Sequence, residues 1–425
     1  MTLMEFLSTH ILKSYLIFKR LVMKKITDET YFKALNLSLK NYKRAIPCLL
    51  IDLNRLDTNI NTLKATLPTA INFRLVVKSL PSYNLIDYIL KKTNTHKLMV
   101  FHQPFLTDLT SKLNEKHDVL IGKPMPIKTA EYYYNNLPKN STGFNPYQQI
   151  QWLVDSEQRI QEYVDLAKKL NQKLHLNIEI DVGLHRGGFM TLNALRNALS
   201  IMTLDSQYIE FSGLMGYDPH VVKLPYIIRS KEKALQLANT FYQECKDLIK
   251  KEFSSLWSST LTFNGAGSPT LNLHTSNNSP LNDISVGSCL VKPTSFNIPS
   301  LKKYQPACYI ATPVLKKFKG TTLPALEKFK NLLSLINSKN KISFFIYGGY
   351  WKADYCYPFN IKENGLFGAS TNQTMINTTK KSILEIDDFV FLQPQQSEFV
   401  FLQFGELLPI RKNSIQQPWQ LLKNN

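Results

Sequence analysis

Short runs of β-branched, aliphatic and aromatic residues alternate with longer segments of helical character between residues 72 and 290. Strands that alternate with helices form β/α units with a parallel sheet. Eight such units can close into a (β/α)8 TIM barrel. The alternation therefore predicts an α/β fold built on such a barrel. The expected strands are Asn72–Val77, Lys97–Phe101, Val119–Ile121, Gln151–Val154, Leu174–Ile180, Tyr208–Leu214, Ser259–Phe263 and Ile284–Leu290.

A doubly wound open sheet is the alternative arrangement of the same elements. Such a sheet is expected to carry a glycine-rich phosphate fingerprint at its first turn. The segment that follows the first predicted strand reads KSLPS and has no glycine. The barrel is therefore the favoured fold.

The segments that flank the barrel have a different rhythm. Cys48–Leu53 is predicted to be a strand and Asn54–Leu67 a helix. After about Pro293 short strands follow one another, which predicts a mostly β domain. We divide the chain into an N-terminal extension (1–46), a barrel (47–292) and a β domain (293–425). The β domain is expected to hold strands at Tyr309–Leu315, Ile342–Tyr347, Asp388–Leu392, Phe399–Phe404 and Leu407–Arg411, and a helix at Ala325–Ile336.

The charge of the chain is strongly positive, with 51 Lys and Arg against 32 Asp and Glu, a net of +19. The longest uninterrupted basic runs are pairs, and no basic helix is interleaved with stacking aromatic residues, so we expect solvated surface charge and no nucleic-acid partner. Leu3–Val22 comes closest to a membrane span, but charged residues interrupt it, so no membrane span is predicted. We expect either an amphipathic lead-in helix or a segment outside the folded domain, since Met23 begins a plausible alternative start. Five cysteines without a C-x-x-C pair indicate reduced thiols in a cytoplasmic protein.

Lys78 directly follows the apolar residues of the first predicted barrel strand. The carboxyl ends of barrel strands are where active sites of this fold lie. Desolvation at that place lowers the pKa of a lysine, which favours imine formation. The alternative is a lysine whose apolar stem reaches along the barrel to place its ammonium in solvent.

A second polar feature is NIEIDVGLHRGGF, in which a predicted strand ends and Arg186 is presented between small residues. A fixed guanidinium there can bind a phenolate or a carboxylate. Two small polar turns follow the seventh and eighth strands, where this barrel class binds phosphate. The candidate phosphate-binding residues in these turns are Gly265, Gly267, Ser268, Thr270, Gly287 and Ser288.

Taken together, these motifs resemble the pyridoxal-phosphate enzymes of the alanine racemase-like barrel, the fold type III family, and within it the D-threonine aldolase and D-serine dehydratase branch. The resemblance is carried by PCLLIDLNRLDTNI, VVKSLPSYNLIDYIL, EIDVGLHRGGF, GLMGYDPH, GAGSPT and VGSCL, in matching order. It runs from about Pro47 to Pro293 and, more faintly, to the C-terminus.

The resemblance implies that pyridoxal 5′-phosphate (PLP) is held as a Schiff base on Lys78, with Arg186 at its phenolic oxygen and Tyr217 near its ring. It also implies a catalytic role for these three residues and a small amino acid substrate, in the D form. In this family the β domain completes the active site of a partner subunit, so a homodimer is expected.

One departure from the branch concerns metal. Its members carry a His-x-Cys pair that helps to bind a metal, whereas FLQPQQSEF places Gln396 and Glu398 at those positions. Zinc prefers thiolate and imidazole ligands, so no metal site is predicted. His220 is interpreted as a loop histidine. The sequence leaves racemisation, aldol cleavage and dehydration open, and it also leaves open a PLP carrier without catalysis or a degenerate binding protein.

Overall fold

The computed structural model describes residues 28–139, 142–225, 227–276, 278–322, 341–378 and 384–423. These residues form two compact units, each assembled from several stretches of sequence. The barrel unit comprises the described parts of Arg55–Ala307, Gln396–Leu407 and Trp419–Asn425. The β unit comprises the described parts of Met1–Asn54, Cys308–Gln395 and Leu408–Pro418. The helices predicted at Leu3–Val22 and Ala325–Ile336 lie outside the described residues.

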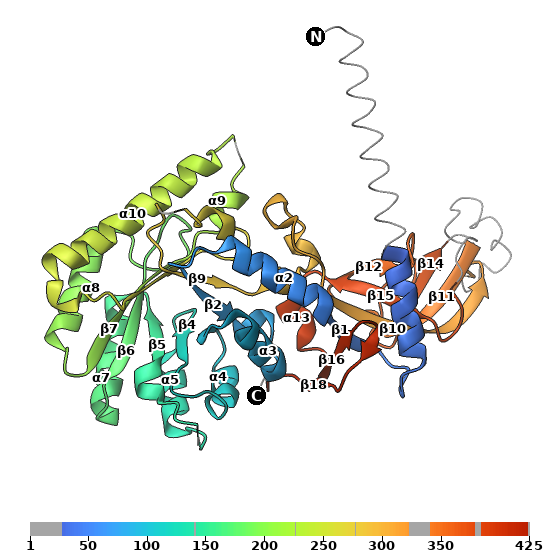
Figure 1. The fold of residues 1–425 in the computed structure, drawn as a ribbon, viewed down its shortest axis with the longest axis horizontal. Coiled ribbons are helices and arrows are strands. Elements are labelled where there is room, and N and C mark those ends of the chain that lie inside the picture. The colour runs from blue at the N-terminus through green and yellow to red at the C-terminus, as the bar shows by residue number, and fades with distance from the viewer. Residues whose placement is uncertain are drawn as a thin grey trace, which may run out of the picture. The chain divides into compact units, whose positions relative to one another are not determined.

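Eight parallel strands close into a barrel, and strands that are consecutive in sequence are neighbours in space (Figure 1). The ring is completed where β2 pairs with β9, with Asn72 opposite Asp283. The eight strands predicted from the sequence are therefore confirmed. They are β2 (Asn72–Val76), β3 (Lys97–Val100), β4 (Asp118–Ile121), β5 (Ile150–Val154), β6 (Leu174–Glu179), β7 (Ile209–Gly216), β8 (Thr262–Gly265) and β9 (Asp283–Val286).

The last barrel strand is shorter than predicted. It was expected to continue to Leu290, but β9 ends at Val286 and Ser288–Val291 forms the short helix α11. Gly287 separates the two elements, and a Cβ at Gly287 would lie 2.7 Å from the carbonyl oxygen of Val76. A turn that passes this close to β2 is open only to glycine.

Helices follow the strands and have ordinary sequence signals at their ends. In α7 the Ser156 side chain accepts a hydrogen bond from the N–H of Arg159, and Asn171 ends the helix in the left-handed conformation. Both are the residue types that favour these positions. The longer helices are α2 (Leu53–Thr66), α3 (Tyr83–Thr93), α4 (Gln103–Thr110), α5 (Ile127–Asn135), α7 (Glu157–Leu170), α8 (Leu192–Leu204) and α10 (Lys231–Glu252), and the short ones include α6 (Pro146–Gln149) and α9 (His220–Lys223).

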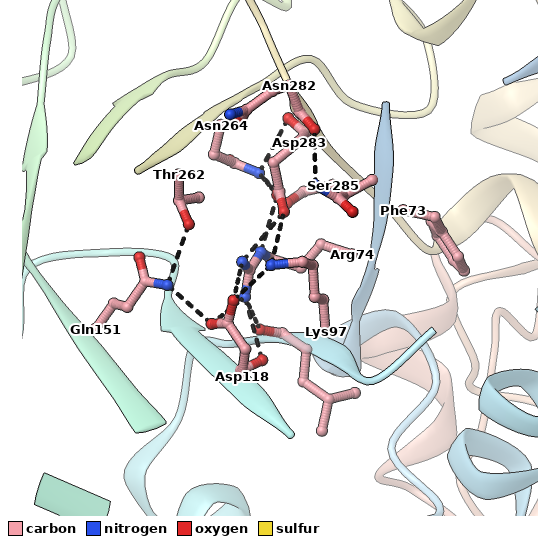
Figure 2. Close-up of polar contacts among 12 residues, drawn as sticks. Phe73, Arg74, Lys97, Asp118, Gln151, Thr262, Asn264, Asn282, Asp283 and Ser285 are labelled. Carbon is pink, nitrogen blue, oxygen red and sulfur yellow. Dashed lines mark hydrogen bonds and ion pairs between the residues drawn. The ribbon is translucent and has the colours of Figure 1, made fainter. Parts of the chain in front are cut away.

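The interior of the barrel has an apolar layer and a charged layer. The apolar layer consists of Val76, Met99, Leu120, Leu153 and Met215. The charged layer lies at the amino-terminal ends of the strands, where Arg74 is fully buried (Figure 2). These two layers separate one end of the barrel from the other.

Arg74 is the centre of the charged layer, and Figure 2 shows its guanidinium between two carboxylates. Its Nε and Nη2 donate to Asp283 at 2.9 and 3.1 Å, and its Nη1 and Nη2 donate to Asp118 at 3.0 and 2.9 Å. Lys97 Nζ adds a contact of 2.7 Å to Asp118. Burial raises the pKa of Asp118, but the nearby Arg74 and Lys97 lower it more, so it lies well below its usual range.

The β unit is an antiparallel sheet in which β10 pairs with β1, β11 and β15. The mostly β domain predicted from the sequence is confirmed. Its strands are β1 (Cys48–Asp52), β10 (Cys308–Lys319), β11 (Ile342–Tyr347), β12 (Ala353–Tyr357), β13 (Lys362–Glu363), β14 (Gln373–Thr378), β15 (Phe389–Pro394), β16 (Glu406–Arg411) and β17 (Ser414–Ile415), and β18 (Trp419–Gln420) pairs with β16.

The first described residues belong to this sheet and not to a separate extension. A helix over residues 28–40 buries Phe32, Leu35 and Leu39 in the same core cluster as Tyr309 and Phe391. The Phe32 ring stacks on Tyr357 at 5.1 Å with an angle of 15°. β1 joins the sheet through β10, so the β unit begins before the barrel and ends after it.

One predicted strand is wrong. Phe399–Phe404 was expected to be extended, but Ser397–Phe401 forms the helix α13. Ser397, Val400 and Phe401 are buried, at the i, i+3, i+4 spacing of a helix, while Phe399 is exposed. A short apolar run does not by itself distinguish a strand from a helix. Among the described residues, no helix has both the length and the apolar character required to cross a bilayer.

Candidate active site

A cavity of about 270 Å³ lies at the carboxyl ends of the barrel strands. Lys78 after β2, Tyr217 after β7 and Gly287 after β9 all contribute to its wall. Among the predicted site residues it brings together Lys78, Arg186, Tyr217, Gly267, Ser268, Gly287 and Ser288. Gly265 and Thr270 are not part of the lining, because Gly265 ends β8 and the Thr270 side chain is buried behind the loop.

Lys78 lies in a single 3-10 turn, η1 (Val77–Ser79), directly after β2. Its Nζ lies 4.3 Å from the centroid of the Phe101 ring and 3.9 Å from Glu398 Oε1. Its side chain is 40% exposed, so the full desolvation expected from the sequence is wrong. The amine is instead presented at the cavity wall between an aromatic face and a carboxylate.

Two hydroxyl groups connect the turns that follow β8 and β9. Ser268 Oγ accepts a hydrogen bond from the N–H of Cys289 at 3.0 Å, and Ser288 Oγ lies 3.0 Å from Ser79 Oγ. A serine oxygen that accepts in this way still has its own O–H to donate. The turns are therefore fixed to each other and to the Lys78 turn, and the Ser268 hydroxyl remains as a donor at the cavity.

Gly267 also occupies a position where a larger residue does not fit. A Cβ at Gly267 would lie 2.9 Å from Cε2 of Tyr217, which lines the same cavity. The preceding residue, Ala266, has a φ of 58°, a conformation that is uncommon for a residue with a side chain. The loop thus stores backbone strain beside a binding surface, where such strain is commonly found.

Arg186 is presented by a turn organised around Asp181. Asp181 Oδ1 accepts from the N–H groups of Gly183 and His185 at 2.9 and 3.0 Å, and its Oδ2 lies 3.0 Å from His185 Nδ1. Burial raises the pKa of Asp181, but these hydrogen bonds lower the pKa by more than burial raises it, so the carboxylate stays ionised. The turn sends the Arg186 guanidinium over the Tyr217 ring, 5.2 Å from its centroid.

Glu179 ends β6 and is 9% exposed. Burial raises its pKa to about 7; Arg186 lowers the pKa, and Asp155 and Asp181 raise it. A carboxyl group whose folded pKa is higher than its unfolded one costs stability as the pH rises through that interval. Sequence analysis did not single out this residue, because only burial at the barrel mouth makes it unusual.

We expect Glu179→Gln to change how stability depends on pH. The wild type should lose on the order of 3 kcal/mol relative to the variant between about pH 5 and pH 8, since the folded protein must ionise a buried carboxyl. Urea denaturation at the two pH values measures this. Glu210→Gln on β7, an exposed position, is the control. Parallel curves for Glu179→Gln and the wild type would contradict the prediction.

The cavity carries an excess of positive charge. Lys78, Arg186 and Lys223 line it, and Glu398 is the acidic side chain found among its described lining residues. Gln396 and Glu398, which stand at the positions of the family's His-x-Cys pair, both line this cavity from the start of α13. Ser79 and Lys223 were missed, although Ser79 immediately follows Lys78 and that adjacency was a usable signal.

The family model of the alanine racemase N-terminal domain matches residues 51–292. The chain belongs to this family. The match covers the barrel from its lead-in strand to the turn after β9, which is the region that forms the cavity. The match confirms the family that the motifs predicted. Members of the alanine racemase-like family use PLP and amino acid substrates.

Solved structures of the same fold are similar over nearly the whole chain. The D-threonine aldolase of Filomicrobium marinum is 12% identical with a TM-score of 0.69, covering 90% of this chain and 98% of its own. D-threo-3-hydroxyaspartate dehydratase from Delftia sp. HT23 is 13% identical with a TM-score of 0.67 and the same coverage, 90% and 98%.

Alanine racemase from Bacillus anthracis is 13% identical with a TM-score of 0.66 and covers 89% of this chain and 98% of its own. No curated protein sequence is significantly similar to the chain. At these identities the likeness establishes the barrel with its β domain, and the three named activities differ from one another.

The family member described here has a cavity whose chemistry fits PLP. A phosphate requires donors and positive potential, which Ser268, Ser288 and the three cations provide. It also requires close approach of the backbone, and a side chain at Gly267 or Gly287 would fill that space. A lysine amine for covalent attachment stands in the same cavity.

Proposed function

We propose that this alanine racemase-family protein is an enzyme that carries PLP on Lys78 and acts on a small amino acid, a D-amino acid, as a racemase or a lyase. The observation that carries the proposal is that one cavity joins the Lys78 amine with the hydroxyl-bearing turns after β8 and β9. An amine and phosphate donors that share one cavity on the barrel rim suit a ligand that is both an aldehyde and a phosphate ester.

Each residue of the cavity then has a distinct role. Ser268 and Ser288 hold the phosphate, for which Gly267 and Gly287 leave room, and Arg186 donates to the phenolic oxygen while it packs on Tyr217. When bound, PLP supplies an electron sink for negative charge at Cα of an amino acid. Lys78, the lysine that follows a barrel strand directly, would hold and return the Cα proton.

The apolar layer of the barrel forms the floor under this chemistry. Val76, Met99 and Met215 line the cavity and belong to the buried cluster of the barrel interior. Phe101 packs against that cluster and faces Lys78. A floor of this kind excludes water and strengthens the electrostatic contacts above it.

Reconstitution of the purified protein with PLP tests the proposal. We expect a visible absorbance band that borohydride removes, and peptide mapping that places the reduced adduct on Lys78. Loss of the Cα proton from D-alanine, D-serine and D-threonine in D₂O then separates an enzyme from a PLP carrier without catalysis. Products of cleavage or dehydration separate a lyase from a racemase. An adduct on another lysine would overturn the assignment.

We also propose that no metal takes part. Gln396 and Glu398 present an amide and one carboxylate, a donor set that binds zinc poorly. Within the described part of the chain, no three His, Cys, Asp or Glu side chains are grouped to hold a metal ion. Treatment with a chelator should therefore leave the activity within about twofold of the untreated enzyme. Stoichiometric zinc that is lost together with activity would contradict this.

Assembly as a homodimer is the third part of the proposal. The segment 346–358 contains Tyr350, which is 67% exposed, while Tyr357 at its other end is buried in the core of the β unit. The exposed end is suited to contact a second copy, since tyrosine gives a large contact area with a polar tip. We expect a dimer by sedimentation at micromolar concentration. Mixing Lys78→Ala subunits with Tyr350→Ala Trp351→Ala subunits should restore part of the activity each lacks, and an active monomer would contradict it.

The thiols support a reducing compartment for this enzyme. Cys245, Cys289 and Cys308 are buried free thiols, and burial raises the pKa of Cys245 and Cys289 to about 12, which keeps them as thiols. Proteins with free, unpaired cysteines are typical of the cytoplasm. We propose that location on these grounds.

A further inference from the structure

Three buried side chains lie directly behind the turn that follows β8 without lining the cavity. Asp218 is 2% exposed, His274 is 2% exposed and Thr270 is fully buried. Asp218 follows Tyr217 at the end of β7, whereas Thr270 and His274 come from the loop after β8. The three side chains therefore join two neighbouring βα loops from the inside.

They form one continuous chain of hydrogen bonds. Thr270 Oγ1 donates to Asp218 Oδ1 at 2.8 Å, and His274 Nε2 lies 2.6 Å from Asp218 Oδ2. At the far end His274 Nδ1 lies 3.1 Å from Ser279 Oγ. Because the Thr270 proton is committed to Asp218, its oxygen is left as an acceptor, and it accepts the N–H of Gly267 at 3.1 Å.

These hydrogen bonds determine which groups of the loop remain available to bind a ligand. The Gly267 N–H is used inside the loop and is not offered to the cavity. Ser268, the next residue, points the other way: it lines the cavity, and its Oγ accepts from the N–H of Cys289. Its hydroxyl proton is therefore the donor that this loop presents.

We propose that Asp218, Thr270 and His274 are positioning residues that hold this loop in its phosphate-binding conformation, so that they control phosphate affinity without touching the ligand. This inference rests on the proposed function, because it takes the ligand of the loop to be the phosphate of PLP. It also gives Thr270, which the sequence suggested as a direct ligand, an indirect role. Buried polar networks of this kind fix one geometry when every member is satisfied.

A positioning role differs from a general stabilising role in one measurable way. Loss of the network should weaken the binding of ligands that carry a phosphate and spare those that do not. PLP and pyridoxal share the aldehyde and the ring, and only PLP carries the phosphate. A distorted loop should therefore weaken binding of PLP and leave binding of pyridoxal nearly unchanged. The ratio of the two dissociation constants measures what the loop contributes.

The test compares Thr270→Val, Thr270→Ser and Thr110→Val with the wild type. Thr270→Val keeps the shape and removes the hydroxyl, and the PLP preference over pyridoxal should fall about tenfold, the effect of one lost buried hydrogen bond. Thr270→Ser restores the hydroxyl and should keep the preference within about twofold. Thr110→Val is the matched control, since Thr110 is equally buried and bonds Tyr133 in another part of the barrel.

Each outcome has a definite meaning. If Thr270→Val and Thr110→Val lower thermal stability equally but neither changes the PLP preference, the positioning role is refuted. If the wild type itself fails to bind PLP, the proposed function is refuted instead. Should Thr270→Val not fold, Asp218→Ala measures the same ratio, because it removes the acceptor of the Thr270 hydroxyl; an unchanged ratio there also refutes the role.

Discussion

Replacing Lys78 with alanine should lower the activity by about 10⁴-fold and should abolish the borohydride-reducible absorbance, while the protein remains folded. The reason is that the variant loses both the point of covalent attachment and the amine that moves the Cα proton. Lys78 is 40% exposed and its distance to Glu398 is 3.9 Å, so little stability depends on it. Turnover, absorbance and thermal unfolding measure the three parts of this expectation.

Lys223→Ala is the matched control, because Lys223 is the other lysine that lines the cavity. It should keep the reducible adduct, since it lies at the end of α9 and not directly after a barrel strand. A small primary amine added to Lys78→Ala should recover part of the activity if the missing group is a proton carrier. Retention of the adduct in Lys78→Ala and its loss in Lys223→Ala would reverse the assignment.

The barrel could be predicted because most of its strands are short apolar runs that a helix follows. Ile150–Val154 is buried at all five positions, as a strand covered on both faces must be. In this fold the active site lies at the carboxyl ends of the strands, so Lys78 could be selected from the many lysines of the chain. Local pattern and general fold rules were sufficient for these features.

The β unit was harder, because its short strands give weaker signals. β12 and β14 were not predicted, and Phe399–Phe404 was assigned to the wrong structure. The predicted strand Phe399–Phe404 has apolar residues at every position except Gln403, so period 2 and period 3.6 both fit it. Burial on one face, which decides the matter, exists only after folding.

Contacts between residues that lie far apart in the sequence are the other features that could not be predicted. Glu398 lies 320 positions from Lys78 in the sequence and reaches it only because α13 returns to the barrel unit. Asp218 and His274 meet across 56 positions through the register of β7 and β8. Neither residue has a spacing that marks it, since the contact depends on how two loops pack.

The same limit applies to the charged layer of the barrel. Arg74, Asp118 and Asp283 come from β2, β4 and β9, and in the sequence each looks like an ordinary charge at the start of a strand. Barrel closure brings them together because β2 and β9 pair, with Arg74 opposite Ser285. Figure 2 shows that the layer continues through Asn264 to Ser285.

This continuation links the charged layer to the site. Asn264 Nδ2 contacts Asp283 Oδ1 at 2.5 Å and Ser285 Oγ at 2.8 Å, and both Asn264 and Ser285 line the cavity. A change at Arg74 therefore acts on two levels, on the stability of the barrel and on the cavity wall above it.

Arg74→Met should destabilise the protein by about 3–5 kcal/mol, measured as the free energy of unfolding in urea at neutral pH. The variant removes the guanidinium but leaves Asp283, whose side chain is 1% exposed, and Asp118 without their main counter-charge. The loss should shrink at acid pH, because protonation neutralises the Asp118 carboxylate. Combining the variant with Asp118→Asn and Asp283→Asn should recover most of the loss, since a neutral layer avoids the buried charge.

Arg196→Met distinguishes this cause from the removal of any paired arginine. Arg196 also binds a carboxylate through two nitrogens, with Glu252 at 2.7 and 2.9 Å, but its side chain is 40% exposed. Water replaces the lost partner there, so its stability should hardly change. Equal losses for the two variants, or a triple variant as unstable as Arg74→Met alone, would show that buried charge is not the reason. The layer would then act by packing, and its link to the cavity wall through Asn264 would carry no electrostatic part.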